Sequence, residues 1–396
     1  MRQTVRQDKA QCTGCGACVS ICPKQAISMA PDAEGFLYPR VDAGKCVGCD
    51  LCEKRCPAGQ VPPKGSGRTF GAQIRDEALR RASSSGGVFT ALARRTLAEG
   101  GVVFGAAFGE GLRVEHVGAL NEDELSPMRG SKYVQSDATD AIAHAVSLLR
   151  RDMPVLFSGT PCQVQGMLAA AGDRHAEKLL TVDFVCHGVP SPGVFASYIG
   201  ELERAHGRRV RAYTFRDKRL GWKNFSAVAA FDDGTEHAGT QVDEPFLYGF
   251  LHNLYLRPAC HGCAALRGDR HAADITLADL WGAQALCAGR DDDTGLSLVI
   301  ANTQKGIAAL EAVRGQLKLF TLGGIAQMER YNPGLTAPPK PHRKRQAFFA
   351  RYKKAGFESA RVMKLLAPAG RVERAWRRIA HLPVGAYRRM RRLLGP

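Results

Sequence analysis

The sequence predicts a mixed fold of the α+β and α/β classes, in which a small cysteine-rich module precedes a larger domain and a basic helical tail. Three observations predict this fold. Two motifs of four cysteines lie within the first 57 residues, a strand–helix–strand pattern occupies residues 154–185, and Lys and Arg crowd the last 57 residues. We expect four parts, namely the module over 1–57, a linker rich in Pro and Gly over 58–71, the large domain over 72–336 and the tail over 337–396.

The two cysteine motifs share the spacing C-x₂-C-x₂-C-x₃-C-P, which is typical of the bacterial ferredoxin fold with two [4Fe–4S] clusters. Three thiolates wrap one face of a cubane, glycines such as Gly14 and Gly48 let backbone N–H groups approach the sulfurs, and the fourth cysteine reaches the other cluster. We therefore assign one cluster to Cys12, Cys15, Cys18 and Cys56, and the other to Cys46, Cys49, Cys52 and Cys22. Zinc knuckles or a disulfide framework are the alternatives, but zinc sites usually use separated cysteine pairs rather than quartets closed by proline.

The composition is that of a globular protein without a membrane span. Apolar residues make up 45% of the chain, and its mean hydropathy is −0.20. No run approaches 18 uncharged apolar residues, and the first ten residues lack the apolar core of a signal peptide. We therefore expect a cytoplasmic protein, whose thirteen cysteines serve in metal ligation rather than in disulfides.

The formal net charge of +17 is concentrated in the tail. From Lys340 onward 17 Lys and Arg face two acids, whereas the preceding residues hold 38 basic and 36 acidic side chains. An apolar stripe recurs between the arginines at helical spacing, although Pro383 should split that helix; it consists of Val372, Trp376, Ile379, Tyr387 and Met390. This pattern is typical of peripheral binding to an anionic membrane surface or to an acidic partner, and a tail packed on its own body is the alternative. Nucleic acid is not expected, because no readout motif accompanies the charge.

The large domain begins with two polar segments that suit a ligand. The first consists of Ser83, Ser84, Ser85, Gly86 and Gly87, and it precedes a helix over 88–99 and a strand over 102–108. Serines and glycines before a helix supply free N–H groups for a phosphate, although the order of elements differs from the dinucleotide fingerprint and an ordinary cap is the simpler interpretation. The second segment, with Gly130, Ser131, Lys132 and Tyr133, would present a cation and a ring to an anionic aromatic ligand, or to solvent.

A β-α-β unit is predicted next. Strands over 154–158 and 179–185 flank a helix over 162–171, so the two strands should be parallel neighbours. Cys162 and Cys186 would then lie at the carboxyl edge of one sheet, where open α/β sheets bind ligands. Two buried structural cysteines are the alternative.

Two more cysteines follow a predicted antiparallel hairpin over 213–231 and a helix over 244–256. They are Cys260 and Cys263, which with Cys162 and Cys186 make four candidate ligands. Their spacing leaves three interpretations open, namely a third cubane, redox-active thiols or a structural zinc. A strand over 298–301 and a helix over 306–313 complete the domain, and Cys287 is read as structural.

Six short segments make residues 72–335 resemble the beta subunit of coenzyme F420 hydrogenases and dehydrogenases. The segments are Ser83–Gly87, Gly130–Tyr133, Thr160–Gln163, Val185–Gly188, Cys260–Cys263 and Asp279–Gly282. The resemblance implies FAD and a [4Fe–4S] cluster in this domain. It implies that Cys162, Cys186, Cys260 and Cys263 hold the cluster, and that the first two segments face the flavin; we also place Thr160 at the cofactor.

The sequence and the resemblance together predict an oxidoreductase. It would pass single electrons between ferredoxin-type clusters and FAD, and exchange two electrons with an organic acceptor or an F420-like deazaflavin. Lys132 and His187 are the candidate catalytic residues, with Lys223 as a further cation. The expected partners are a ferredoxin or a subunit of a redox complex, and a small-molecule acceptor. A non-catalytic electron-transfer subunit and a membrane-associated reductase serving polysaccharide biosynthesis are the alternatives.

Overall fold

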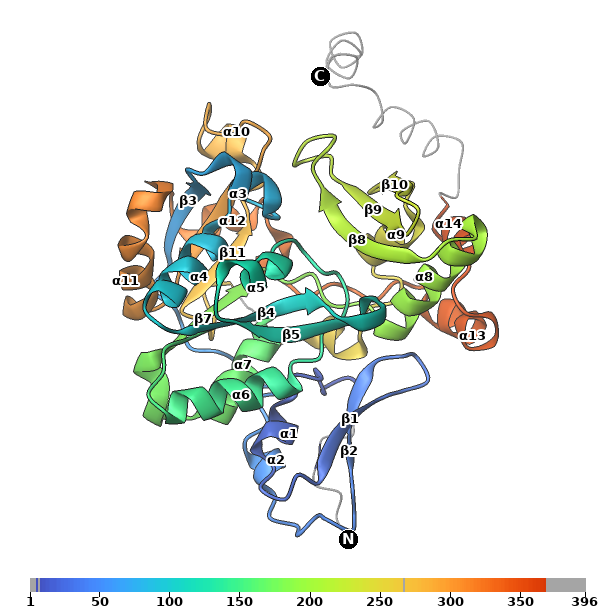
Figure 1. The fold of residues 1–396 in the computed structure, drawn as a ribbon, viewed down its shortest axis with the longest axis horizontal. Coiled ribbons are helices and arrows are strands. Elements are labelled where there is room, and N and C mark those ends of the chain that lie inside the picture. The colour runs from blue at the N-terminus through green and yellow to red at the C-terminus, as the bar shows by residue number, and fades with distance from the viewer. Residues whose placement is uncertain (1–4, 6–7, 266–267, 368–396) are drawn as a thin grey trace.

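A computed structural model describes residue 5, residues 8–265 and residues 268–367 of the chain (Figure 1). The apolar stripe predicted from Val372 to Met390 lies outside these residues. Within the described part of the chain, no helix combines the length and the apolar character needed to cross a bilayer.

A mixed eight-stranded sheet forms the centre of the body. Its strand order is β13-β3-β12-β11-β7-β6-β4-β5. The strands are β3 (Arg68–Ile74), β4 (Val102–Phe108), β5 (Val114–Ala119), β6 (Val155–Ser158), β7 (Leu179–Phe184), β11 (Ile275–Asp279), β12 (Ser297–Ala301) and β13 (Leu317–Thr321). The four middle strands β4, β6, β7 and β11 are parallel, and the outer strands pair antiparallel. Because β3 starts at Arg68, it takes up the end of the predicted linker over 58–71.

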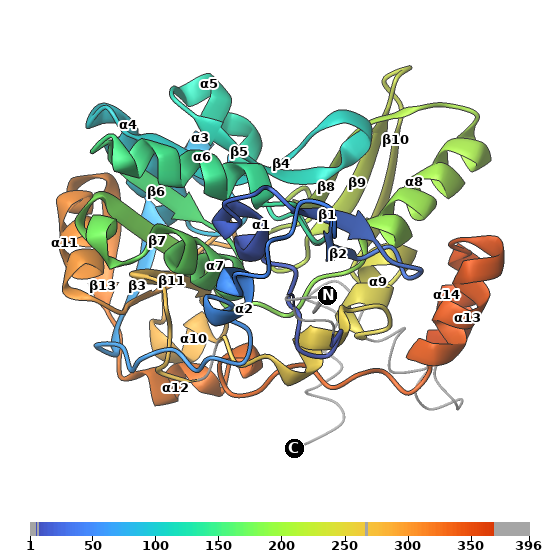
Figure 2. The ribbon, with the colours of Figure 1, turned by 90° about the horizontal axis from the view of Figure 1, so that it is seen from below.

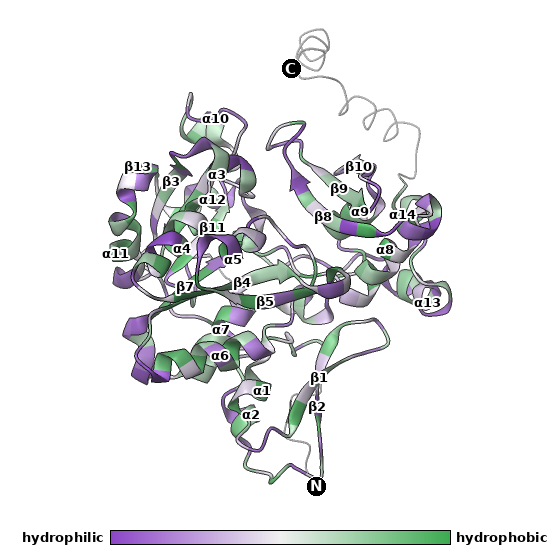
Figure 3. Cartoon of the chain, in the orientation of Figure 1, coloured by the Kyte–Doolittle hydropathy of each residue, from purple (hydrophilic) through white to green (hydrophobic). Residues whose placement is uncertain are grey.

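Helices cover both faces of this sheet. α4 (Val88–Ala98) and α11 (Gln304–Ala312) pack on one face, where Val103 and Leu156 point. α6 (Thr139–Arg150) and α7 (Pro161–Ala171) pack on the other face, against the alternate strand residues Phe104 and Phe157. In Figure 3, β4 and β7 are mostly green and apolar, whereas α11 mixes green with purple, as expected for a helix with one buried face. The shorter helices are α3 (Glu77–Ala82), α5 (Glu122–Leu125), α10 (Ala283–Leu286) and α12 (Ile325–Glu329).

The predicted β-α-β unit is confirmed. β6 and β7 are parallel neighbours, with Val155 opposite Leu179, and α7 connects them. Thr160 caps α7 in a reciprocal box with Gln163, and Pro161 occupies the first turn, where its missing N–H costs nothing.

A smaller sheet packs beside the body with the order β10-β9-β8. Its strands are β8 (Val210–Asp217), β9 (Ser226–Phe231) and β10 (Glu236–Thr240), flanked by α8 (Pro192–His206) and α9 (Pro245–Leu251). The predicted antiparallel hairpin over 213–231 is confirmed. The helix predicted over 244–256 is too long, because Asn253 takes a left-handed φ of 59° that a helix cannot continue through.

The described part of the predicted tail belongs to this smaller core. Residues 345–366 form α13 (Arg345–Ala355) and α14 (Ser359–Leu366). Phe348, Phe349 and Phe357 are buried in one cluster with Tyr198 and Phe246. A tail starting at 337 is therefore not separate from the body over its first thirty residues.

The N-terminal module lies at the lower end of the molecule in Figure 1, below α6 and α7. It contains α1 (Ala17–Ile21), β1 (Ile27–Pro31), β2 (Leu37–Val41) and α2 (Leu51–Lys54), and β1 and β2 form an antiparallel hairpin between the two cysteine motifs. α1 packs against both α6 and α7, and the view from below shows it beside α7 (Figure 2).

Candidate redox site

The eight cysteines of the module line two small cavities. One is lined by Cys12, Cys15, Cys18 and Cys56, with Cys52 at its border. The other is lined by Cys22, Cys46, Cys49 and Cys52. We call these sets the proximal and distal quartets. The structure thus brings together the two quartets that the motif spacing predicts, with the last cysteine of each motif beside the first three of the other.

Left-handed backbone conformations turn each motif around its cavity. Gly14 and Gly48 occupy the same place in the two motifs and have φ of 69° and 67°. Gly16 and Asp50 are also left-handed and start α1 and α2. Glycine adopts this left-handed conformation at no steric cost, and Asp tolerates it. The turns around the cavities therefore explain the residue types at these four positions.

Burial makes bare thiolates unfavourable in the proximal quartet. The pKa of the Cys15 thiol is raised to about 12, mainly by burial; the Ala17 N–H lowers it, and the thiols Cys162, Cys56 and Cys12 contribute to the rise. The pKa of Cys18 is also raised, again mainly by burial. Iron ligation requires the thiolate form, so a positively charged metal centre would supply the compensation that these sites lack.

A third set of cysteines gathers at the carboxyl edge of the large sheet. Cys162 lies in the first turn of α7 and Cys186 follows β7, while Cys260 and Cys263 lie in and directly after a single 3₁₀ turn over Pro258–Gly262. The pKa of Cys162 is raised to about 11 and that of Cys260 to about 12, mainly by burial, and repulsion by Cys263 contributes to both shifts. We call this set the core quartet. The structure brings together all four residues that the sequence named.

Polar groups lie at two sulfurs of the core quartet. Among the described residues, no group of three Cys, His, Asp or Glu side chains is found that could hold a single metal ion. Two donors already point at sulfur, because the Gly188 N–H donates to Cys186 Sγ at 3.3 Å and the Thr160 hydroxyl lies 3.2 Å from Cys162 Sγ.

The proximal and core quartets are neighbours. Thr13, between the first two cysteines of the proximal quartet, lowers the pKa of the Cys162 thiol, and the Cys162 thiol raises the pKa of Cys15. A Cβ atom on Gly166 of α7 would lie 3.0 Å from Cys15 Sγ, so this glycine lets the helix approach the sulfur.

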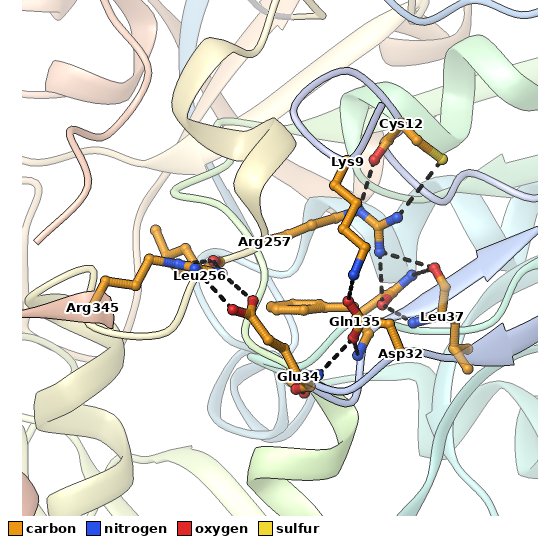
Figure 4. Close-up of polar contacts among 11 residues, drawn as sticks. Lys9, Cys12, Asp32, Glu34, Leu37, Gln135, Leu256, Arg257 and Arg345 are labelled. Atoms are coloured by element: carbon orange, nitrogen blue, oxygen red, sulfur yellow. Dashed lines mark hydrogen bonds and ion pairs between the residues drawn. The ribbon is translucent and has the colours of Figure 1, made fainter. Parts of the chain in front are cut away.

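Polar contacts dock the module on the body (Figure 4). Arg345 of α13 forms an ion pair with Glu34 at 2.6 Å, and the Ser191 hydroxyl donates to the Glu34 carbonyl at 2.5 Å. Arg257, directly before the core cysteines, reaches into the module and hydrogen-bonds to the Cys12 carbonyl at 2.9 Å. The docking residues come from three distant parts of the chain.

The two segments predicted to face a flavin lie together. The Ser131 hydroxyl donates to the Ser84 hydroxyl at 2.9 Å. Ser83 and Ser85 instead donate to the nearby carbonyls of Leu79 and Leu296. The glycines of the first segment have a packing reason: a Cβ on Gly86 would lie 2.2 Å from the Ala72 carbonyl oxygen, and Gly87 caps α4 with φ of 82°.

Lys132 is turned back onto its own loop. Its ammonium donates to the carbonyls of Pro127, Arg129 and Gly130 at 2.6, 2.8 and 3.3 Å. Burial lowers the pKa of Lys132 to about 7. Hydrogen bonds to the three carbonyls favour the charged form of Lys132. Its buried ammonium can therefore keep its proton near pH 7.

A row of rings connects the core quartet with the second segment. The His187 ring, next to Cys186, meets the Phe250 ring edge-on at 5.1 Å between centroids. Phe250 stacks on Tyr133 at 4.8 Å. The space between the core quartet and the Ser84–Ser131 contact is therefore bridged by three packed side chains.

Sequence reasoning missed a buried ion pair at this place. Arg216 of β8 donates to Asp279 at the end of β11, at 2.5 Å, and its guanidinium lies 4.4 Å from the Phe225 ring centroid. Burial opposes the charge of Arg216, but Tyr133 and Asp279 raise its pKa. Two of its nitrogens, Nε and Nη2, are buried without a hydrogen bond among the described residues. The available signal in the sequence was an arginine among the apolar residues of a predicted strand, which indicates a buried charge. Lys223, named as a further cation, pairs with Asp291.

Comparison with protein families decides the relationship. Residues 69–143 match the N-terminal domain, and residues 152–322 the C-terminal domain, of the coenzyme F420 hydrogenase/dehydrogenase beta subunit. The chain belongs to this family. Residues 11–60 match a 4Fe-4S dicluster domain, so this family member is an oxidoreductase-type iron–sulfur protein.

Among solved structures, a chain of the F420-reducing [NiFe] hydrogenase complex from Methanosarcina barkeri, studied by xenon derivatization, is similar to this family member at 18% identity. The match covers 78% of this chain and 95% of that chain, with a TM-score of 0.44. No curated protein sequence matches significantly.

Proposed function

We propose that the chain is an iron–sulfur flavoprotein oxidoreductase. It passes single electrons through three [4Fe–4S] clusters to FAD and exchanges two electrons with an organic acceptor or an F420-type deazaflavin. The observation that carries the proposal is the contact between the proximal and core quartets through Thr13 and Gly166. This contact makes the three quartets one continuous series.

The order of the three quartets in space gives the proposed path of the electrons. The distal quartet includes the exposed Cys49, so it is the place where a redox partner protein exchanges electrons. The proximal quartet receives them inside the docked module, and the core quartet passes them toward the Ser84–Ser131 contact. In the reducing direction, two electrons arrive one at a time from a ferredoxin-type donor, and a hydride leaves with the organic acceptor after one proton is taken up.

FAD, when bound, supplies the conversion between one-electron and two-electron transfer. Ser84, Ser131, Tyr133 and the cap residue Thr160 would line its site. The free Nε and Nη2 of Arg216 fit a carbonyl or anionic group of the ring system, because buried donors without a partner are costly unless a ligand completes them. Lys132 would hold a proton beside this place, and His187 would orient the ring row; both roles are proposals.

The test compares Cys162→Ser with Cys287→Ser in the full-length protein under anaerobic conditions. Cys287 lies outside all three quartets and serves as the matched control. We expect about twelve irons in the parent and in the control, and about eight in Cys162→Ser. Reduction of the flavin by a reduced ferredoxin should slow by about 100-fold in Cys162→Ser only. Flavin reduction at the parental rate, or bound zinc in place of iron, would overturn the proposal.

Two alternatives make different predictions. A non-catalytic electron-transfer subunit would contain clusters without flavin and would not exchange hydride with any acceptor, including F420. Steady-state reoxidation of the reduced protein against a panel of organic acceptors separates that alternative from the proposal, and it also identifies the acceptor class.

Peripheral association with an anionic membrane is proposed for residues 368–396. They carry eight arginines and one acid, and a basic residue near an anionic bilayer contributes about 1 kcal/mol. Truncation after Ala367 keeps the packed helices α13 and α14, so it should abolish sedimentation with anionic liposomes at low salt and leave flavin reduction unchanged. Full-length protein that ignores such liposomes would refute this association.

A further inference from the structure

Arg257 occupies the boundary between the N-terminal module and the body. It lies three residues before Cys260, and its backbone N–H donates to the Val189 carbonyl at 2.9 Å, which fixes it beside the core quartet. Its side chain leaves the body and enters the module (Figure 4). The residue is fully buried, with 0% of its surface exposed.

The guanidinium is held by neutral groups. Nε donates to the Cys12 carbonyl at 2.9 Å, and Nη1 donates to the Leu37 carbonyl at 3.0 Å and to Gln135 Oε1 at 3.1 Å. The Tyr38 ring centroid lies 3.9 Å from its central carbon. Among the described residues it forms no ion pair with a carboxylate. A buried cation without a counter-ion is costly, so this site requires negative charge from elsewhere.

The remaining nitrogen points at sulfur. Nη2 lies 3.8 Å from Cys12 Sγ, within reach of an N–H···S hydrogen bond. Gly14 leaves room for this arrangement, because a Cβ there would lie 2.9 Å from the Arg257 central carbon and 2.6 Å from Gln135 Nε2. The first cysteine of the proximal quartet is therefore the nearest group that can carry a negative charge.

We propose that Arg257 is the counter-ion of the proximal cluster and raises its reduction potential. The inference rests on the proposed function, in that the proximal quartet holds a [4Fe–4S] cluster. A reduced cluster carries one more negative charge than an oxidised one. A fixed positive charge and a hydrogen bond at a ligand sulfur therefore stabilise the reduced form more. Arg257 therefore stabilises the electron on the proximal cluster, next to the core quartet.

The position of Arg257 also couples the two neighbouring quartets. Its backbone lies between Val189 and Cys260 beside the core quartet, while its side chain reaches Cys12, so one residue spans both quartets. Arg257 does not contact the acceptor site. It is a positioning residue that sets where an electron rests.

The experiment is a redox titration of the full-length protein, monitored by electron paramagnetic resonance under anaerobic conditions. Arg257→Met should shift electron sharing between the proximal and distal clusters toward the distal cluster by at least about tenfold, equivalent to about 59 mV for a one-electron couple. Arg257→Lys retains the charge but cannot donate to the Cys12 carbonyl and sulfur together, so it should give a smaller shift in the same direction. Arg345→Met removes an ion pair at the same interface without touching a ligand and should leave the sharing unchanged.

A second measurement, on the parental protein, tests the proposal even if the Arg257→Met variant does not fold. In the parental protein labelled with ¹⁵N-arginine, pulsed resonance of the reduced proximal cluster should show a hyperfine coupling to guanidinium nitrogen. An Arg257→Met protein that keeps its iron and the parental potentials would overturn the proposal, as would the absence of that coupling. Both measurements concern the module's clusters alone, so they distinguish failure of this inference from failure of the flavin chemistry.

Discussion

The proximal and distal quartets have the same cysteine spacing and opposite surroundings. Cys12 and Cys15 are each 9% exposed, beneath α7 and Arg257. Around the distal quartet Cys49 is exposed, as are Val47 at 62% and Leu51 at 39%. The difference comes from what the body covers, since the local backbone of the two motifs is alike. We therefore propose different roles for two motifs of the same cysteine spacing, one as an internal relay and the other as a point of exchange.

Exposed apolar side chains around the distal quartet support that division. Val47 and Leu51 flank Cys49 in the sequence, and Lys45 and Lys54 lie close by on the surface. An apolar centre with a charged rim is a usual composition for a transient protein interface. Among the described residues, Cys49 is the only exposed cysteine, so the distal quartet offers a partner the more direct access.

The largest expected effect comes from removing one ligand from each quartet. Cys15→Ala should slow flavin reduction by about 100-fold with every donor, because the internal relay is lost. Cys49→Ala should slow it comparably with a protein donor but much less with methyl viologen, which does not need the docking surface. Stopped-flow absorbance of the flavin measures both. Equal behaviour of the two variants with both donors would remove the distinction between relay and exchange point.

A second test uses the equivalent glycines Gly14 and Gly48. Substitution by Ala costs about 1–2 kcal/mol at both, because their φ angles are nearly the same. Only at Gly14 would the new methyl group meet Gln135 and Arg257, while nothing lies within 4 Å at Gly48. Gly14→Ala should therefore lose a further 1–3 kcal/mol or so of unfolding free energy. Denaturant unfolding measures both variants. Equal losses of unfolding free energy would contradict the docked arrangement.

A smaller effect is expected at the distal surface. Leu51→Ser removes an exposed apolar side chain, so the unfolding free energy should change by no more than about 0.5 kcal/mol. The rate of reduction by a protein donor should fall by about fivefold, as for an interface residue worth roughly 1 kcal/mol. Leu220→Ser, at another exposed leucine in the body, is the control. The same slowing in the control would show that the partner does not dock at the distal quartet.

The last prediction concerns the body alone and provides a reference for the module. Burial raises the pKa of Asp183 to about 8, and one of its carboxylate oxygens has no partner among the described residues. The folded state therefore holds a proton that the unfolded state releases near pH 4, so stability is present below that pH and is lost as the pH rises toward 8. Asp183→Asn should flatten this dependence in denaturant unfolding between pH 4 and 8. An unchanged slope would mean that Asp183 is ionised in the folded protein.

The predictable parts of the fold are those that depend on local patterns. The β6-α7-β7 unit and each four-cysteine motif of the module follow from spacings within about thirty residues. Arg257 could not be anticipated, because it contacts Cys12 across 245 positions of the chain. The same holds for Gly86, which packs closely against the Ala72 carbonyl of β3.

The tail shows most clearly what sequence composition alone could not predict. Basic composition after Lys340 indicated a separate segment, whereas Phe348, Phe349 and Phe357 are buried in a core with Tyr198 and Phe246. Charge dominated the composition, and three aromatic residues determined the packing. A pattern averaged over sixty residues cannot separate these contributions.

The exposure of Cys49 has a consequence for the handling of the protein in air. Oxygen and peroxide reach solvent-facing thiolates first, because susceptibility to oxidation follows accessibility. Aerobic purification should therefore remove the distal cluster while the buried clusters survive. Such material would contain about eight irons, the number also expected for a chain without a core cluster. Only the resonance signals, and not the iron content, would then reveal which cluster the air has destroyed.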